Sequence, residues 1–580
     1  MTSQRKNQKT LPYFKDVSGK YVCSICRSEY TCQSNVCRHY KKHHPEDDNE
    51  EKSIFTYKGK LINKSTERIL IWKCCHGIPM AALSDCLLTD LLPPSTLKSA
   101  KTNQNILNDM CQQIVDFNYL KAREKSVSLI LDGGTVNHTK WLAVGFMHRT
   151  LENNKFQVLD VRVFEKTTSN DIKYQIEQIS DKIQKKANGK VVAACTDNAQ
   201  NFRKIFLDDD LVLDDFIPLS MVRVSCSCHT IQLALKDLKN VDNYYSNLIE
   251  KIKVIPTKIS FLSKADIKRL NIASFPPLQK QRWNSVFITL SYIISNVGAI
   301  SSLFNINEIG FFNMFDLLQL QKELRPIYEF TIKCETDNFN QANVFIEFRA
   351  LESKLEVLNT KRSKKLLSLI RKRFSITADI EISKLCYFTT NAGINEKRER
   401  FPHIPLSAID TSDEESKRKF DNEMKFIHSF EKTIQKIYAK MKLDFKTVLT
   451  AFDIMMKHYV PANDEIHQFP SPQELKSLIS EYSSNETMYI DLAKFIDLLQ
   501  VLPSSEAGAE RVFARMRDIF HKKQTRLSPE SLRTNLIVSF YVDQEMPKEY
   551  FDRIGNWPDN QKEELDEEEE EEIMENDEYE

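Results

Sequence analysis

A cluster of Cys and His residues between positions 23 and 44 constrains the fold of this chain more than any other sequence feature. Cys23 and Cys26 form a C-x2-C pair, twelve residues separate Cys26 from His39, and His43 or His44 follows. This spacing is typical of a Cys2His2 zinc site. Because so short a segment cannot bury enough apolar surface to fold alone, we expect one Zn²⁺ to hold it, with binding worth roughly 10–16 kcal/mol in comparable fingers. The plain alternative is a basic tail with unpaired Cys and exposed His.

The net charge of zero hides an uneven distribution of charge along the chain. Residues 563–580 hold 13 acids and no Lys or Arg, which leaves 81 basic against 68 acidic side chains in the rest. The segment around the Cys and His cluster is also basic and includes Arg38, Lys41 and Lys42. A cationic body favours a polyanionic partner, and we expect double-stranded DNA with these three residues on its phosphates. The acidic tail, 546–580, is expected to be disordered.

The sequence argues against secretion and against insertion into a membrane. The N-terminal MTSQRKNQKT lacks the apolar core of a signal peptide, and no segment approaches the roughly 18 apolar residues of a membrane span. The 13 Cys are an odd number in a long chain, which favours reduced thiols and a metal site over a disulfide framework. We therefore expect a reducing compartment and, with DNA as the partner, the nucleus.

The order of apolar patterns predicts a multidomain α+β protein. After a zinc finger over 1–48 and a charged linker, helical spacing over 55–122 predicts a small unit for DNA binding and assembly. Residues 123–240 then give three strand-like runs, a helix, a strand, a helix, a strand and a helix. This is the order of the ribonuclease-H-like fold, with its first three strands as an antiparallel meander.

The second half of the chain is predicted to be almost wholly helical. We expect an all-α insertion over 241–488, with a looser polar stretch from about Asn391 to Glu415. The C-terminal part of the core follows over 489–545, where a helix after Pro503 carries an apolar stripe. That helix would pack on the sheet of the core.

Acidic residues stand where predicted strands end. Asp132 ends the first strand of the meander and Asp197 ends the strand after the first helix, and these strands are neighbours in the expected fold. The helix after Pro503 offers a third acid, Glu506 or Glu510, one turn apart. An Asp after a strand is often a turn or helix cap, so only the three positions together indicate a site. Three converging carboxylates would bind Mg²⁺ or Mn²⁺ beside a phosphodiester, as in two-metal sites.

Five segments, in this order, resemble the hAT superfamily of cut-and-paste DNA transposases: LILDGGT, CTDNAQNF, CSCHTIQLAL, QRWNS and SSEAGAERVFARMRDIFHKKQTRLSPESL. The resemblance runs from the finger to about Val542, and its last segment is the most specific. In the family the third catalytic acid directly precedes Arg in an ER-x-F motif, which implies Glu510. The family has Ser after that Phe, where this chain has Ala514. The run SNVCRHYKKHHPE resembles the helix end of a BED-type finger, whose last ligand precedes Pro, and this favours His44 over His43.

The same resemblance implies roles for two further pairs of residues. Cys226 and His229 match a C-x2-H motif beside the family's active site, where the His positions the scissile phosphate. Without the family, a helix cap or a core role explains them equally well. Arg282 and Trp283 match an RW motif whose Trp stacks on a base displaced during hairpin formation, although a lone Trp is usually part of a core.

A run of basic residues interleaved with leucines is expected to lie on one amphipathic helix. It could grip DNA phosphates or serve as a nuclear address, and an ordinary solvated helix face is the plain alternative. The run consists of Lys361, Arg362, Lys364, Lys365, Arg371, Lys372 and Arg373.

These features lead us to expect a DNA transposase with structural Zn²⁺ and catalytic Mg²⁺ or Mn²⁺ that binds transposon ends and target DNA and assembles as a dimer or higher oligomer. The resemblance implies free 3′ hydroxyls on the excised element, hairpins on the flanking DNA, and attack of those hydroxyls on the target. The alternative is a host-adopted regulator that keeps the fold and the finger but has lost catalysis. A nuclease or polymerase accessory of the same fold is a weaker alternative, because it leaves the ER-x-F segment unexplained.

Overall fold

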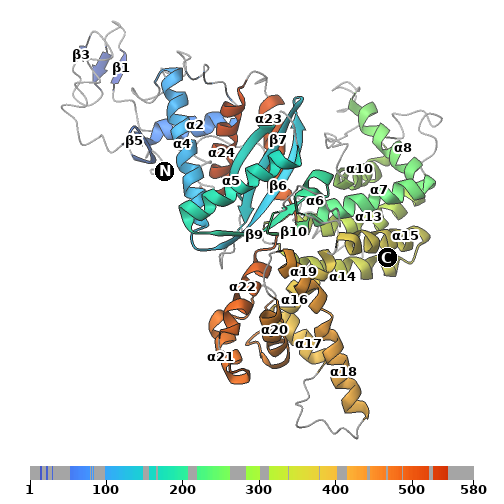
Figure 1. Cartoon of the computed structure of the whole chain (residues 1–580). Coiled ribbons are helices and arrows are strands. Elements are labelled where there is room, and N and C mark those ends of the chain that lie inside the picture. Colours follow the sequence, from blue (N-terminus) through green and yellow to red (C-terminus); the bar gives the residue numbers. More distant parts are fainter. Residues whose placement is uncertain are drawn as a thin grey trace, which may run out of the picture. The chain divides into compact units, whose positions relative to one another are not determined.

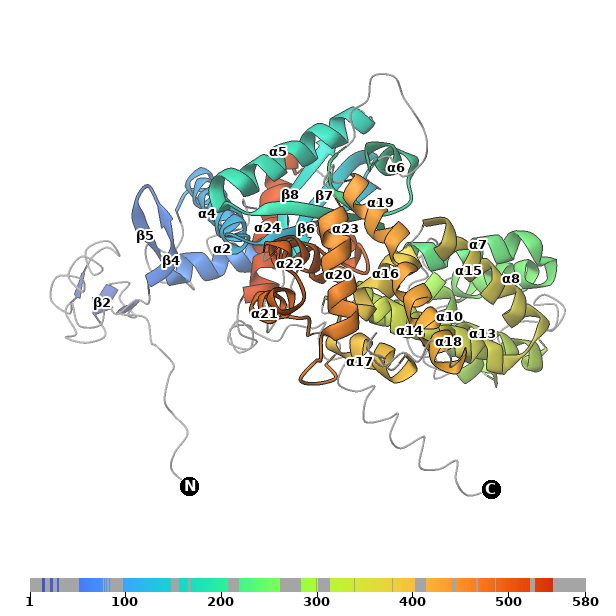
Figure 2. The same ribbon diagram turned by 60° about the horizontal axis from the view of Figure 1, so that its bottom comes forward.

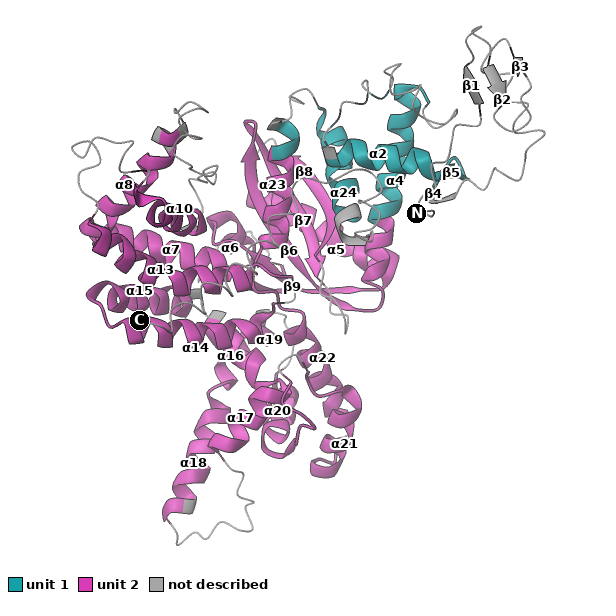
Figure 3. Cartoon of the chain, turned by 180° about the vertical axis from the view of Figure 1, so that it is seen from behind, with its two compact units in different colours: residues 1–115, 518–580 teal, residues 116–517 magenta. Residues whose placement is uncertain are grey.

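The computed structural model describes the chain in segments. These are residues 13–15, 21–23, 29–30, 52–76, 78, 80, 83, 98–147, 156–164, 168–206, 219–260, 283–298, 300, 313–337, 339–377, 379–401, 414–440, 445–465, 468–485, 487–521 and 527–545. The chain divides into two compact units, residues 1–115 with 518–580 and residues 116–517, and each is described by itself (Figure 3).

The first unit combines small antiparallel sheets with helices. One sheet joins β1 (Tyr13–Lys15), β2 (Tyr21–Cys23) and β3 (Glu29–Tyr30), and the other is a hairpin of β4 (Lys52–Tyr57) and β5 (Lys60–Asn63). The helices are α2 (Lys64–His76), most of α4 (Ala100–Lys121), the end of α23 (Ala507–His521), and α24 (Pro529–Glu545).

The hairpin and the last helix of this unit differ from the sequence prediction. The expected helical unit over 55–122 begins with a β-hairpin, because Lys58 and Gly59 have positive φ (50° and 75°) and close a two-residue turn. Helix α24, expected with the catalytic core, packs against α2. There the buried Lys73 Nζ donates to Asn535 Oδ1 at 2.7 Å. A buried ammonium needs such a partner, so this bond ties the two helices at a specific point.

The second unit is built on a five-stranded mixed sheet. Its first elements are β6 (Ser126–Val136), β7 (Thr139–Met147), β8 (Gln157–Phe164), α5 (Ser169–Ala187), β9 (Lys190–Thr196), α6 (Gln200–Phe206), β10 (Val222–Ser225) and α7 (Ser227–Val241). The strand order is β10-β9-β6-β7-β8: β6, β7 and β8 form an antiparallel meander, β9 runs parallel to β6, and β10 runs parallel to β9. The predicted order of elements and the predicted pairing of the first strand with the fourth are confirmed.

Local sequence explains why these elements form. Asn137 and His138, both with positive φ, make the two-residue turn between β6 and β7. Helix α5 begins at a capping box of Thr168 and Asp171 and ends at Asn188 in the left-handed conformation. Its Ile residues recur at three- and four-residue spacing and are buried, as expected of a helix that covers a sheet (Figure 1).

The region after α7 is helical in every element that the structure describes. The elements are α8 (Asn243–Ser260), α10 (Trp283–Ser295), α13 (Met314–Cys334), α14 (Gln341–Leu358), α15 (Lys361–Thr377), α16 (Asp379–Phe388), α17 (Asn391–Arg400), α18 (Glu414–His428), α19 (Glu431–Lys440), α20 (Lys446–His458), α21 (Pro472–Tyr482), α22 (Met488–Gln500) and the main part of α23. Part of its core is aromatic: the Phe388 ring of α16 meets Phe426 of α18 edge-on at 4.9 Å and lies 5.9 Å from Phe430, the residue before α19. Helices α16 and α19 lie side by side (Figure 2).

The looser stretch predicted over Asn391–Glu415 is wrong in its first part, where α17 spans Asn391–Arg400. Thr390 caps this helix, since its hydroxyl accepts a backbone N–H of the first turn at 3.1 Å. Lys397 is buried and pairs with Glu423, also buried. Because this buried ion pair takes the place of apolar contacts, α17 has few apolar residues. Its polar composition therefore suggested a loop.

In the part of the chain that the structure describes, no helix is long and apolar enough to cross a membrane. The mixture of a five-stranded sheet with many helices confirms the predicted α+β class.

Candidate active site

The register of β6 and β9 places Asp132 and Asp197 at one edge of the sheet. In this parallel pair Ile130 lies opposite Cys195, and the two acids each follow two residues later. Asp132 is still within β6, opposite Ala143 of β7, whereas Asp197 comes directly after β9. Neighbouring parallel strands run in the same direction, so residues at matching steps beyond the last pair lie side by side. The first two predicted acids are therefore brought together.

A buried arginine holds the loop that carries Asp197. Arg223 of β10 donates from Nε to Thr196 Oγ1 at 2.7 Å and from Nη2 to Asn198 Oδ1 at 3.0 Å. The same Nη2 donates to the backbone carbonyl of Asp197. On its other side, Asp197 Oδ1 accepts the backbone N–H of Ala199 at 2.9 Å. Sequence reasoning missed Arg223, although a charged residue inside the apolar run MVRVSC was a usable signal.

Helix α23 brings the third predicted acid to the same strand. A Cβ built on Gly134 of β6 would lie only 3.0 Å from Phe513 Cε1, so the buried Phe513 ring packs directly on the strand backbone. Glu510 precedes Phe513 by one helical turn and shares its face of α23. Asp132 precedes Gly134 by two residues and shares its face of β6. The ring contact therefore aligns Glu510 with Asp132.

A fourth carboxyl, that of Glu506, lies within the same cluster. Burial raises the pKa of Glu506 well above its usual range, and the charges of Asp132, Asp197 and Glu510 raise it further. The carboxylates of Asp132, Asp197 and Glu510 are therefore near enough to Glu506 for their charges to act on it. Glu506 is 3% exposed, and its Oε2 has no hydrogen-bond partner among the described residues. Glu510 is only partly buried, so of the two glutamates it is better placed to meet a substrate.

Cys226 and His229 open α7 beside these acids. Cys226 is the N-cap of the helix, and its Sγ accepts the backbone N–H of His229 at 3.4 Å. Burial raises the pKa of the Cys226 thiol well above its usual range, which fits a neutral cap rather than a nucleophile. Burial lowers the pKa of the His229 imidazole, and the charges of Asp197 and Glu510 oppose this shift. His229 is thus a mostly neutral donor near the carboxylates.

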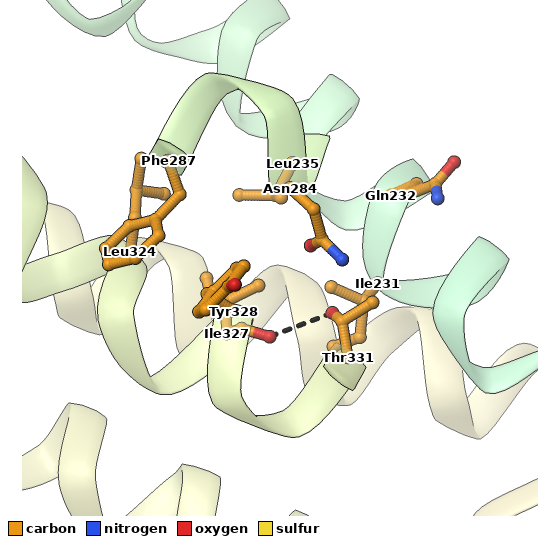
Figure 4. Close-up of a pocket in the computed structure, with 9 residues that line it drawn as sticks. All are labelled: Ile231, Gln232, Leu235, Asn284, Phe287, Leu324, Ile327, Tyr328 and Thr331. Atoms are coloured by element: carbon orange, nitrogen blue, oxygen red, sulfur yellow. Dashed lines mark hydrogen bonds between the residues drawn. The ribbon is translucent and has the colours of Figure 1, made fainter. Parts of the chain in front are cut away.

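The start of α10 shares a pocket with α7 and α13. Figure 4 shows a small pocket between α7, α10 and α13, lined by Ile231, Gln232, Asn284, Phe287 and Tyr328 among others. The rings of Phe287 and Tyr328 stack with centroids 4.6 Å apart. Trp283 is the first residue of α10. Arg282 and the side chain of Trp283 lie outside the described residues.

The predicted zinc site is described only at one backbone position. Cys23 is the last residue of β2, and its side chain is not described. The remaining predicted residues of the finger lie outside the described part of the chain: Cys26, Arg38, His39, Lys41, Lys42, His43 and His44. The zinc prediction therefore stays a prediction.

The predicted basic run forms α15, and acids on other helices neutralise its arginines. The ion pairs are Arg362–Glu323 (2.6 Å), Arg371–Glu352 (2.6 Å), Arg371–Glu356 (2.7 Å) and Arg373–Asp237 (2.6 Å). Lys365 Nζ donates to the backbone carbonyl of Val241 at 2.5 Å. Lys361, Lys364 and Lys372 are exposed and make no ion pair with the described residues. These three lysines are the part of the run that is available to a partner.

The acidic cluster fits Mg²⁺ or Mn²⁺ by the chemistry of its donors. Both ions take carboxylate oxygens, and the buried Glu506 Oε2 is an oxygen without a protein partner among the described residues. Asp132, Asp197 and Glu510 would be the ligands. Within the described segments, no group of three or more His, Cys, Asp or Glu is positioned to hold a metal ion as it stands.

In comparisons with known proteins, no family model and no curated protein matches the chain. The function is therefore inferred from the residues of the acidic cluster and its surroundings.

Proposed function

We propose that this chain is a cut-and-paste DNA transposase of the hAT type, with the five-stranded sheet as a ribonuclease-H-like catalytic core. The observation that supports it best is that Asp132 and Asp197 follow the paired strands β6 and β9 at matching steps, while Phe513, one turn after Glu510, packs on the strand of Asp132. Carboxylates that repel one another and perturb a neighbour's pKa are costly to a fold, and such clusters concentrate at catalytic sites.

The chemistry is phosphodiester hydrolysis followed by transesterification. Bound Mg²⁺ or Mn²⁺ supplies activation of the attacking oxygen and stabilisation of the leaving oxygen. Asp132, Asp197 and Glu510 would hold the ions. His229, kept neutral by burial, donates an N–H to a non-bridging oxygen and so orients the scissile phosphate. Arg223 fixes the loop of Asp197 and keeps that carboxylate at the edge of the sheet.

The order of events follows from the resemblance to the hAT superfamily. The element leaves with free 3′ hydroxyls, and the flanking DNA closes into hairpins. Trp283 stacks on the base displaced as a hairpin forms, next to Arg282. The free hydroxyls then attack target DNA.

The finger and three lysines of α15 are the proposed DNA contacts. Zn²⁺ on Cys23, Cys26, His39 and His44 would fold the finger, and Arg38, Lys41 and Lys42 would bind phosphates of the transposon ends. Lys361, Lys364 and Lys372 add an exposed basic face on α15. Because one finger reads only about three base pairs, specific end recognition favours several copies of the chain acting together. A nuclear location accords with this function.

A second candidate is a DNA-binding regulator that has lost catalysis. It is favoured by the observation that no metal-holding group is preformed among the described residues. Such a protein would bind the same DNA and leave it intact. The presence of all three acids together with His229 supports the enzyme over the regulator.

Cleavage of the DNA that flanks the protein's own gene tests the proposal. Matching terminal repeats in that DNA would define an end substrate, which the purified full-length protein should cut to hairpins with Mg²⁺ or Mn²⁺. Asp132→Asn protein should bind the same ends without cutting them. If wild-type protein binds the ends but makes no hairpin with either metal, the regulator is the better assignment.

A further inference from the structure

The segment before α23 is buried and hydrogen-bonded to the corner between α13 and α14. Ser504 Oγ lies 2.9 Å from the carbonyl oxygen of Cys334 and 3.0 Å from that of Phe339, and Ser505 Oγ donates to Cys334 O at 2.7 Å. Gln341 Nε2 donates to the backbone carbonyl of Pro503 at 2.8 Å. Both serines are buried, so these bonds are shielded from water. The start of the helix that carries Glu510 is therefore fixed to the all-α region.

The same corner holds α23 a second time, directly after Glu510. Arg511 pairs with Asp337, and its Nη1 donates to the carbonyl of Glu335 at 3.3 Å. The two attachments stand on either side of Glu510 in the sequence. Rotation of α23 about its axis, which would move Glu510 off the sheet edge, is thus opposed at both points.

Helices α7 and α10 also contact this corner. Asn284 of α10 donates from Nδ2 to Glu335 Oε1 at 3.4 Å. Cys228, the neighbour of His229 on α7, lies with Sγ 3.7 Å from the carbonyl of Thr331. Figure 4 shows Asn284 and Thr331 among the residues that line the pocket between α7, α10 and α13. Residues 331–337 therefore contact α7, α10 and α23.

We propose that Asp337 is a positioning residue for the third catalytic acid, acting through Arg511 to fix Glu510 against Asp132 and Asp197. This inference rests on the proposed function for its catalytic meaning. The Arg511 and Asp337 side chains are 43% and 32% exposed, and ion pairs so exposed add little to stability. Loss of the pair should therefore leave the free energy of unfolding nearly unchanged, so that a change in kcat reports the placement of Glu510.

The test compares Asp337→Ala with Lys333→Ala in the full-length protein. Lys333→Ala breaks the Lys333–Glu347 pair (2.9 Å) between α13 and α14 without touching α23, and is the matched control. In Asp337→Ala we expect kcat for hairpin formation with Mn²⁺ to fall about tenfold with KM for DNA unchanged, since small misplacements of a catalytic group slow the reaction step. Asp337→Glu should restore most of the rate, and Lys333→Ala should match wild type.

Hydrogen–deuterium exchange of the peptide covering residues 505–516 gives a second readout that needs no activity. Asp337→Ala should speed exchange there by about threefold or more, because the helix start loses an attachment, and Lys333→Ala should not. Unchanged exchange and unchanged kcat in Asp337→Ala, or the same loss in Lys333→Ala, overturns the positioning role. If exchange shifts as expected while wild type makes no hairpin with any metal, Asp337 still holds the start of α23 and the proposed function fails.

Discussion

The contact between Gly134 and Phe513 gives the sharpest quantitative prediction, because two adjacent glycines differ in what surrounds them. A Cβ at Gly134 would lie 3.0, 3.1 and 3.2 Å from three carbons of the Phe513 ring. Ordinary carbon contacts are about 3.5–4.0 Å, so Gly134→Ala must push the ring back by about 0.5 Å. A Cβ at Gly133 would meet nothing closer than 3.9 Å, which makes Gly133→Ala the matched control.

Overpacking of this kind costs about 1–3 kcal/mol. Because Glu510 stands one turn from Phe513, the same shift displaces the third acid. A catalytic group misplaced by about 1 Å slows a reaction about 100-fold, so a shift of about 0.5 Å should lower kcat about tenfold. Both substitutions replace a glycine of β6 with alanine, so they should lower the entropy of the unfolded chain by similar amounts. The assay is hairpin formation with Mn²⁺ alongside thermal unfolding, with Phe513→Leu added to Gly134→Ala as a rescue. Equal activity in the two alanine variants would refute the claim that this contact places Glu510.

Three further predictions concern other parts of the chain. In chelator-containing buffer, Glu506→Gln should raise the thermal unfolding midpoint more at about pH 8 than at about pH 5. The pKa of Glu506 in the folded protein lies above the ordinary 4.5, so the stability that its protonated form contributes is lost as pH rises. Equal shifts of the midpoint at both pH values would contradict this. His44→Ala should abolish the binding of Zn²⁺ and of transposon ends, whereas His43→Ala should keep both. The reverse result would make His43 the ligand. Lys372→Gln should lower the salt slope of DNA affinity by about 0.9, whereas Arg371→Gln, whose guanidinium two glutamates already hold, should leave it unchanged.

The parts of the fold and site that local pattern encodes were predictable. Runs of apolar residues located β6 and β9, and the expected order made them neighbours, which the register confirms. Asp132 and Asp197 could then be named because acids at the ends of adjacent parallel strands must converge. Glu510 required the family resemblance, since periodicity alone left Glu506 equally possible. In the structure the charges of Asp132, Asp197 and Glu510 all raise the pKa of Glu506.

The parts that depend on distant partners were not predictable. Arg371 and Arg373 looked like DNA contacts, but their acidic partners stand on α14 and α7, and no local pattern reveals such neutralisation. Arg223 supports Asp197 from a strand that follows it in the sequence. The polar residues of α17, Lys397 among them, made it look like a loop, and the buried partner of Lys397 is on another helix. In each case the missing information was which charge meets which across the fold.

Hairpin formation on an element end already nicked in the flank tests the central claim most directly, because the nick supplies the 3′ hydroxyl and only transesterification remains. The account predicts that wild-type protein with Mn²⁺ converts this substrate to a hairpin. It also predicts that Asp197→Asn binds the substrate equally well but reacts at least about 1,000-fold more slowly. Hairpins formed at the wild-type rate by Asp197→Asn, or by wild type with all metal chelated, would contradict it.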